Sequence, residues 1–165
     1  MRRKILALGV TAFAVAAVVL TAMPWAVLDD AGVPFSWNGF GHGTYRYENG
    51  PTVDVASTTP LGIWIVIACV AALVSAVALL VPALSRLVAP VCRVTALITL
   101  TAGLLALAVI VRPAIFLDSG FSDLGMRPLL GVAREFLQLS TIVGVSALML
   151  ATAAGAAAAA VTTNR

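Results

Sequence analysis

Long apolar runs divide this chain, and four of them are close to the length that crosses a bilayer. They cover residues 5–23, 61–84, 94–111 and 136–161, and none of these ranges contains Asp, Glu, Lys, Arg or His. About 20 apolar residues in a helix cross about 30 Å of hydrocarbon. The pattern therefore predicts an all-α membrane protein: a four-transmembrane-helix bundle that forms one integral membrane domain over residues 1–165.

The first run follows a basic segment, as the apolar part of a secretory signal peptide does. Its apolar stretch is longer than is usual for such a peptide, and no small-x-small cleavage site ends it. Cleavage after Ala22 or Ala26 would place Leu20 or Pro24 at the −3 position, which requires a small residue. We therefore expect a retained helix.

Residues 24–60, between the first two runs, have a different pattern. Residues 35–38, 44–48 and 52–55 alternate between apolar and polar side chains, as half-buried strands do. A turn is expected at residues 30–34, on the way out of the first helix. The segment therefore predicts a small β-rich cap with three strands between helices 1 and 2.

The register of the last two strands follows from their apolar positions. Asn49-Gly50 is a strong hairpin signal. A two-residue turn there would set aromatic side chains opposite polar ones. A three-residue turn would pair Tyr47 with Val53 and Tyr45 with Val55, so that one face becomes apolar, as one-sided burial requires. We predict the second register.

The other connections differ in length. The link over residues 85–93 is short, so the second and third helices should be antiparallel neighbours. Residues 112–135 contain several apolar side chains that we expect to lie on the membrane or against a partner. Trp25 and Trp64 lie near the expected ends of two helices, as residues of an interfacial aromatic belt do.

Charge adds an orientation. Only 10% of the residues are charged, against about 25% in soluble domains. Six basic residues and no acid fall on one side of the predicted spans, and all seven acids with four arginines fall on the other. The two sides therefore carry +6 and −3, in agreement with the net charge of +3. By the positive-inside rule both termini are cytoplasmic, and loops 24–60 and 112–135 are extracytoplasmic. A basic patch for nucleic acid is absent, since the basic residues flank apolar spans.

Small residues predict where helices pack. Close backbone approach drives association in lipid, because lipid tails are as apolar as the helices themselves. The second and third helices carry spaced Ala, Thr and Gly residues. The fourth has the clearest stripe, at a spacing of four: Ala147, Ala151, Gly155 and Ala159. The two cysteines, Cys69 and Cys92, fall at different depths and are expected to be reduced packing residues.

The residues of familiar catalytic and metal sites are missing. His42 is the only histidine, and a zinc site needs three or four ligands. Gly39, Gly41 and Gly43 form a GxGxG run, but no strand and helix of a nucleotide-binding unit surround it. We therefore predict no catalytic residue, no cofactor and no metal, and expect a protein that is not an enzyme.

The cap carries the most specialised residues. Aromatic residues together with Arg are enriched at the centres of protein interfaces. The aromatic residues of the loop and its histidine are therefore the candidate partner contact, although a purely structural cap is the plain alternative; they are Trp37, Phe40, His42, Tyr45 and Tyr47.

The layout is similar to that of the claudin-like four-span proteins, which also carry a small sheet between helices 1 and 2. The loop motif of that family holds a Trp, then Gly-Leu-Trp, then two cysteines. Here Trp25 and Gly39-Phe40 are comparable, and the loop has no cysteine. The resemblance covers the layout and implies no function.

Three functions fit these features. The leading hypothesis is a non-enzymatic accessory or scaffold subunit of a larger membrane complex, with other integral membrane subunits and lipids as partners and the plasma membrane as its location. The high ratio of Arg to Lys is typical of GC-rich bacterial genomes. One alternative is a small transporter or channel for an apolar or lipidic substrate, with a cavity lined by Thr95, Thr99 and Gln138. The other is a cell-envelope sensor in which His42 responds to pH.

Overall fold

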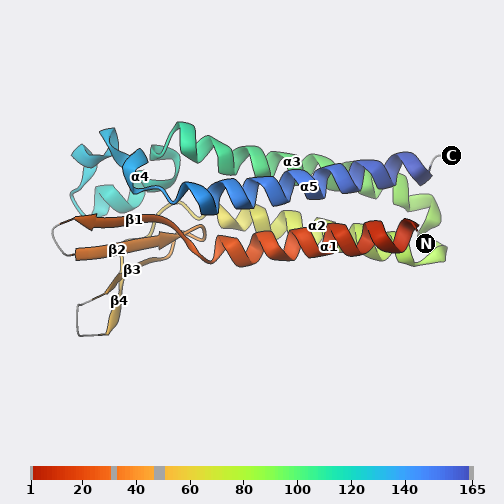
Figure 1. Cartoon of the computed structure of the whole chain (residues 1–165), viewed down its shortest axis with the longest axis horizontal. Coiled ribbons are helices and arrows are strands. Elements are labelled where there is room, and N and C mark those ends of the chain that lie inside the picture. The colour runs from red at the N-terminus through yellow and green to blue at the C-terminus, as the bar shows by residue number, and fades with distance from the viewer. Residues whose placement is uncertain (1, 31–32, 47–50, 164–165) are drawn as a thin grey trace.

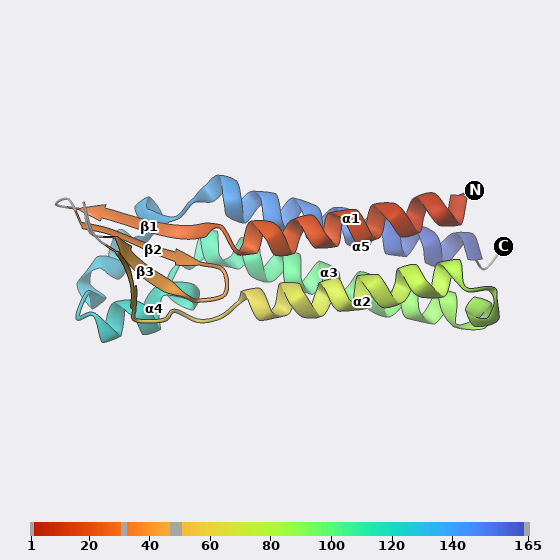
Figure 2. The same ribbon diagram turned by 90° about the horizontal axis from the view of Figure 1, so that it is seen from below.

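Four long helices form the body of the molecule in the computed structural model, which describes residues 2–30, 33–46 and 51–163. They are α1 (Arg2–Thr21), α2 (Gly62–Leu80), α3 (Val88–Val111) and α5 (Leu139–Thr163). All four are long and apolar enough to cross a membrane, as predicted. Figures 1 and 2 show them lying lengthwise side by side, with a small sheet at one end, the cap end, and both termini at the other, the terminal end.

The helices form a four-membered ring in which α1 contacts α2 and α5, and α3 contacts the same two helices. Small side chains fill the ring, and Ala14, Ala17, Ala68 and Ala72 have no exposed surface. At Gly103 a Cβ atom would lie 3.2 Å from the Met149 Cβ, so α3 and α5 approach closely there. The expected small-residue packing of the second and third helices is thus present.

The link at the terminal end differs from expectation in its boundaries. We expected the second span to run to Leu84, but α2 ends at Leu80 and a 3₁₀ helix, η1 (Pro82–Leu87), follows it. Proline lacks the N–H that would continue the helical bonding pattern, which explains this end. Pro90 falls within the first turn of α3, where proline is tolerated, so α3 starts six residues before the expected Val94.

The sheet has four antiparallel strands in the order β1-β2-β3-β4. Their bounds are β1 (Pro24–Asp30), β2 (Val33–Asn38), β3 (Gly43–Arg46) and β4 (Thr52–Val55). The prediction of three strands was therefore one too few. The missed strand, β1, follows α1 almost directly, and Trp25, Ala26 and Leu28 are all buried. Burial on both faces removes the alternation that identifies a half-buried strand.

The predicted hairpin register was wrong by two residues, although the face was right. Tyr45 pairs with Val53 rather than with Val55, and Gly43 takes the place opposite Val55. Side chains alternate faces with a period of two, so a shift of two keeps Tyr45 and Val53 on one face. The predicted pairing of Tyr47 lies outside the described residues.

Residues 112–135 are folded onto the sheet. They form α4 (Ala114–Asp123), η2 (Arg127–Gly131) and most of η3 (Ala133–Phe136). Phe116, Leu117 and Phe121 have no exposed surface within the chain itself, so for these side chains the expected contact with membrane or partner was wrong. Arg134 Nη2 donates a hydrogen bond of 2.7 Å to the carbonyl oxygen of Val111, which ties this segment to the end of α3.

Both cysteines are free and buried, as expected, and they belong to separate hydrophobic clusters. Between α2 and α3 the Ser75 hydroxyl donates to Thr95 Oγ1 at 2.6 Å, and Thr95 Oγ1 donates to the carbonyl oxygen of Ala71 at 3.0 Å. This short chain of hydroxyls joins the two helices through groups that would otherwise be costly to bury.

Candidate functional site

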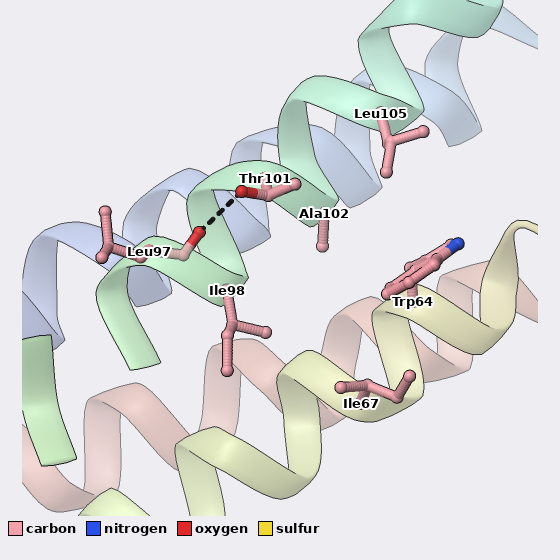
Figure 3. A pocket seen from close by; sticks show the side chains of 7 residues that line it. All are labelled: Trp64, Ile67, Leu97, Ile98, Thr101, Ala102 and Leu105. Atoms are coloured by element: carbon pink, nitrogen blue, oxygen red, sulfur yellow. Dashed lines mark hydrogen bonds between the residues drawn. The ribbon is translucent and has the colours of Figure 1, made fainter. Parts of the chain in front are cut away.

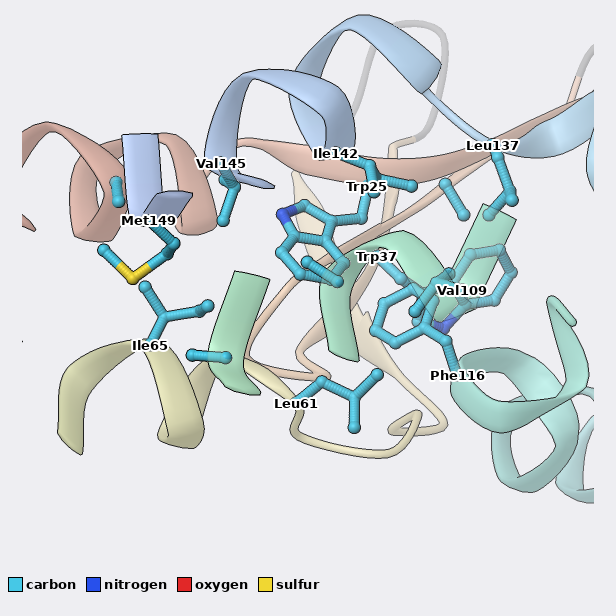
Figure 4. Close-up of a cluster of buried hydrophobic side chains, with 14 of the residues drawn as sticks. Trp25, Trp37, Leu61, Ile65, Val109, Phe116, Leu137, Ile142, Val145 and Met149 are labelled. Carbon is cyan, nitrogen blue, oxygen red and sulfur yellow. The ribbon is translucent and has the colours of Figure 1, made fainter. Parts of the chain in front are cut away.

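The junction between bundle and cap is built around Trp25, which has no exposed surface. Its ring packs against Phe116 at a centroid distance of 5.6 Å, and Figure 4 shows it among side chains from the ends of several helices. Its backbone oxygen accepts a hydrogen bond of 2.8 Å from the Gln138 N–H. The expected place of Trp25 in an aromatic belt was therefore wrong, whereas Trp64 is 51% exposed on α2.

Trp37, a predicted partner contact, is also fully buried. Its Nε1 donates a hydrogen bond of 2.9 Å to the Ala56 carbonyl oxygen. Its ring packs against Phe121 at 5.7 Å and against Phe35 at 6.0 Å. The ring thus joins the sheet to α4 and presents no surface to another protein.

Glycines let the chain pass close to both indole rings. A Cβ at Gly39 would lie 2.5 Å from Trp25 Cε2, and one at Gly43 would lie 2.6 Å from Trp37 Nε1. A Cβ at Gly62 would lie 2.8 Å from the carbonyl oxygen of Gly39. Real Cβ atoms do not approach other atoms this closely. Gly39 and Gly43 of the GxGxG run therefore permit close packing of the backbone on the two indole rings.

The other predicted contact residues lie at different depths. Phe40 and Tyr45 are half-buried, and Tyr45 packs on Phe35 at a centroid distance of 5.2 Å. His42 is exposed, and its Nε2 lies 3.3 Å from Asp54 Oδ1. Tyr47 lies outside the described residues. Of the four that the structure describes, Phe40, His42 and Tyr45 are thus accessible in whole or in part.

His42 and Asp54 form a simple surface pair. Their side chains are 53% and 80% exposed, and exposed pairs of this kind contribute about 0–1 kcal/mol. Ser36 Oγ shares its hydrogen bond with Thr44 Oγ1 at 2.9 Å, not with His42. Within the described part of the chain no three His, Cys, Asp or Glu residues come together as metal ligands. The role of His42 as a pH sensor remains a prediction.

Two buried polar atoms stand out at the junction. Trp25 Nε1 and Thr58 Oγ1 have no hydrogen-bond partner among the described residues. Most buried polar side-chain atoms in proteins do have one. Trp25 therefore stabilises the junction through the apolar contacts of its ring, while Trp37 stabilises it through ring contacts and a hydrogen bond.

The predicted stripe on α5 turns partly inward. Ala159 is buried, and a Cβ at Gly155 would lie 2.9 Å from Val10 Cγ2, so this part of the stripe packs on α1. Ala151 is half-buried and Ala147 is exposed. The side of α5 that is buried most deeply instead includes Ile142, Val145 and Met149. Sequence alone could not separate these faces, because alanines occur on all sides of this helix.

A groove lies on the outside of the bundle between α2 and α3, near the cap end. Its volume is about 350 Å³, and Figure 3 shows Trp64 and Ile67 on one wall and residues 97–105 of α3 on the other. Thr101 supplies the only hydroxyl among its lining residues, and that hydroxyl donates to the Leu97 carbonyl oxygen at 2.9 Å. The groove is therefore apolar.

The residues expected to line a transport cavity are not brought together. Thr99 Oγ1 donates to the carbonyl oxygens of Thr95 and Ala96 in its own helix, at 2.8 and 3.2 Å. Gln138 is exposed at the cap end. Thr95 lies about 24 Å of helix rise before the cap end of α3, since each residue adds 1.5 Å. The Thr95 hydroxyl thus bonds across to α2, and the Thr99 hydroxyl bonds to the backbone of its own helix.

Comparisons with protein-family models, with curated proteins and with solved structures give no match for this chain. The likeness to claudin-like proteins therefore stays a likeness of layout.

Proposed function

We propose that this chain is a multi-pass plasma-membrane protein that serves as a non-enzymatic accessory or scaffold subunit of a larger membrane complex. Support for insertion comes from the outside of the bundle. Leu8, Val70 and Leu97, on three different helices, are 72%, 55% and 65% exposed. All four long helices expose bulky apolar side chains. Large exposed apolar patches are rare on soluble monomers, whereas lipid covers them without penalty.

The proposed orientation places the cap outside and the terminal end in the cytoplasm. The charge distribution supports it, because cytoplasmic ends of membrane proteins are enriched in Lys and Arg. Arg86 lies in the α2–α3 link and Arg93 lies near the start of α3, whereas Asp29, Asp54 and Glu135 belong to the cap.

Labelling in intact cells tests this orientation. We expect a cysteine introduced by Asp54→Cys to react with a membrane-impermeant maleimide, since this side chain is 80% exposed on the cap. The matched variant Ser85→Cys should react only after permeabilisation. Both native cysteines are buried, which keeps the background low. The reverse labelling pattern would overturn the orientation.

The observation that carries the scaffold proposal is the face that α5 turns away from the bundle. Positions 147, 151, 154 and 158 are all alanine, at the spacing of one helix stripe; three of them are exposed and Ala151 is half-buried. The same face also exposes Val143, Leu150 and Val161, but between them the alanines predominate. On α2 the exposed side chains Val70, Val74 and Val77 are all bulky, and each is about half exposed. Small residues allow a second helix to approach closely, whereas bulky ones suit contact with lipid. The alanine face, defined by Ala147, Ala151, Ala154 and Ala158, is therefore the proposed contact for a helix of another subunit.

Affinity purification in mild detergent tests this contact. We expect one or more integral membrane proteins to co-purify with the native chain. The double variant Ala154→Leu/Ala158→Leu should reduce their recovery at least fivefold, because the added side chains hold the partner helix away. Ala12→Leu places the same side chain at an exposed position of α1 and serves as the control. Solitary monomers at every detergent concentration would contradict the scaffold proposal.

A lipidic transporter is the second candidate, and the groove beside Trp64 is the observation that favours it. Its apolar walls would take an alkyl chain rather than a polar solute. Proteoliposomes that move a labelled fatty acid no faster than empty vesicles would remove this candidate.

A further inference from the structure

Two further grooves lie between α2 and α3 toward the terminal end, and they share a wall. Their volumes are about 410 and 330 Å³. Val74, Leu87 and Val91 line both of them, so one ridge of side chains separates two adjacent hollows. The remaining lining residues are apolar except for Thr95, whose hydroxyl is already bonded to Ser75 and Ala71. The two grooves are thus apolar and lie next to each other on the surface of the bundle.

Two arginines are next in the chain to residues that line these grooves. Arg86 lies in η1 next to Leu87, and Arg93 lies in α3 next to Val94, and both arginine side chains are exposed. The sequence holds no Asp or Glu between positions 55 and 117, so the segment that forms the grooves carries no acid. Arg3 and Lys4 add exposed positive charge at the same end. The mouth of the grooves is therefore suited to an anion.

We infer that this end of the molecule binds one anionic glycerophospholipid. Its phosphate lies between Arg86 and Arg93, and its two acyl chains lie in the two grooves on either side of the Leu87 ridge. Charge complementarity selects this occupant over a second copy of the chain, because a second copy would bring the same positive charges to the same place. Arginine holds phosphate oxygens through two parallel N–H donors, and basic pockets between membrane helices bind anionic headgroups.

The inference goes beyond the scaffold proposal and needs only that the bundle resides in lipid or detergent. A binding experiment in micelles therefore tests it independently of any partner and of the orientation. Dioleoyl-phosphatidylglycerol is the probe, and dioleoyl-phosphatidylcholine, with identical tails and no net charge, is the reference. Native mass spectrometry of the purified full chain counts the bound lipids, and titration gives the apparent Kd.

We expect one molecule of the anionic lipid to bind at least tenfold more tightly than the zwitterionic one. Arg86→Gln and Arg93→Gln should each weaken binding about fivefold, the usual effect of one basic residue near an anionic surface. Arg86→Lys should retain most of the affinity. Arg46→Gln, an exposed arginine on the cap, is the charge-matched control and should change nothing.

A groove variant separates the tails from the headgroup. Val91→Trp fills both hollows but leaves every arginine in place, so it should weaken binding of the anionic lipid without changing the charge. Equal affinity for both lipids, or unchanged affinity in the double variant Arg86→Gln/Arg93→Gln, would overturn the inference. So would a dimer that forms through this face and excludes the lipid.

Discussion

Replacing Trp25 with alanine should lower the free energy of unfolding by about 3–5 kcal/mol, the usual loss when a buried Trp or Phe is truncated. The ring has no exposed surface and packs on Phe116 at a centroid distance of 5.6 Å. Its removal would leave a cavity where α1, the sheet and α4 meet. Equilibrium unfolding of the detergent-solubilised protein gives the measurement.

Phenylalanine variants are the matched controls. Trp25 Nε1 has no partner among the described residues, so Trp25→Phe loses contact area but no hydrogen bond. Trp37→Phe loses the same contact area, because it also replaces an indole by a phenyl ring. It leaves the Ala56 carbonyl without its hydrogen-bond donor as well. The loss should therefore be greater at Trp37 by about 1–3 kcal/mol. This description of the junction would be incorrect if the free energy of unfolding of Trp25→Ala lay within about 1 kcal/mol of the native value. It would also be incorrect if the two Phe variants had equal free energies of unfolding.

Gly41→Ala is the second substitution with a large expected effect, a loss of about 3 kcal/mol or more. Gly41 has a φ of +79°, a conformation that alanine adopts only with strain. Its new Cβ would also collide with the carbonyl oxygen of Thr58, whose own N–H donates to the Gly41 oxygen at 2.9 Å. Neither backbone can move without breaking this bond between the cap and the start of α2.

Two other glycines separate strain from collision. Gly125 has a φ of +70° but nothing within 4 Å of an added Cβ, so Gly125→Ala should lose only the strain of about 1–2 kcal/mol. Gly131 has open space and no positive φ, and Gly131→Ala should stay within about 0.5 kcal/mol of the native protein. Thermal unfolding of the three variants in one detergent should rank them in this order. A Gly41→Ala protein as stable as Gly125→Ala would show that the Thr58 contact is unimportant.

The four long helices could be read from the sequence because their signal is strong and local. Twenty apolar residues without a charge define a span whatever the rest of the chain does. The ends were less certain: Pro82 stops α2 before the apolar run ends, while Pro90 is accommodated within the first turn of α3. Hydropathy does not distinguish a proline that ends a helix from one that begins it.

The cap was only partly predictable, because its core comes from three distant segments. Trp25 follows α1, Trp37 lies in β2 and Phe121 lies in α4, and contacts among such segments leave no local pattern. The spacing of Phe116, Leu117, Gly120 and Phe121, all buried, does fit one face of a short helix. That spacing is a local signal for α4 within the loop expected over residues 112–135.

The candidate site shows the same limit. The aromatic residues of the loop are conspicuous in the sequence, but composition does not tell which of them point inward. Trp37 is buried by α4, a partner from about 80 positions later in the chain, while the glycines that looked like a ligand loop are needed for close contact with the indole rings. Only tertiary structure separates the accessible His42 from the buried Trp37.

The order of synthesis gives one of these contacts a further meaning. The backbone oxygen of Trp25 is bonded to Gln138, and Ala26 pairs with Leu137, just before the last helix begins. The first strand to leave the ribosome pairs with β2 soon afterwards, but its other edge lacks this bridge until more than a hundred further residues have been added. Contacts of such long sequence separation form late and slowly. A nascent chain that stalls before Leu137 would therefore leave this edge of the sheet unpaired.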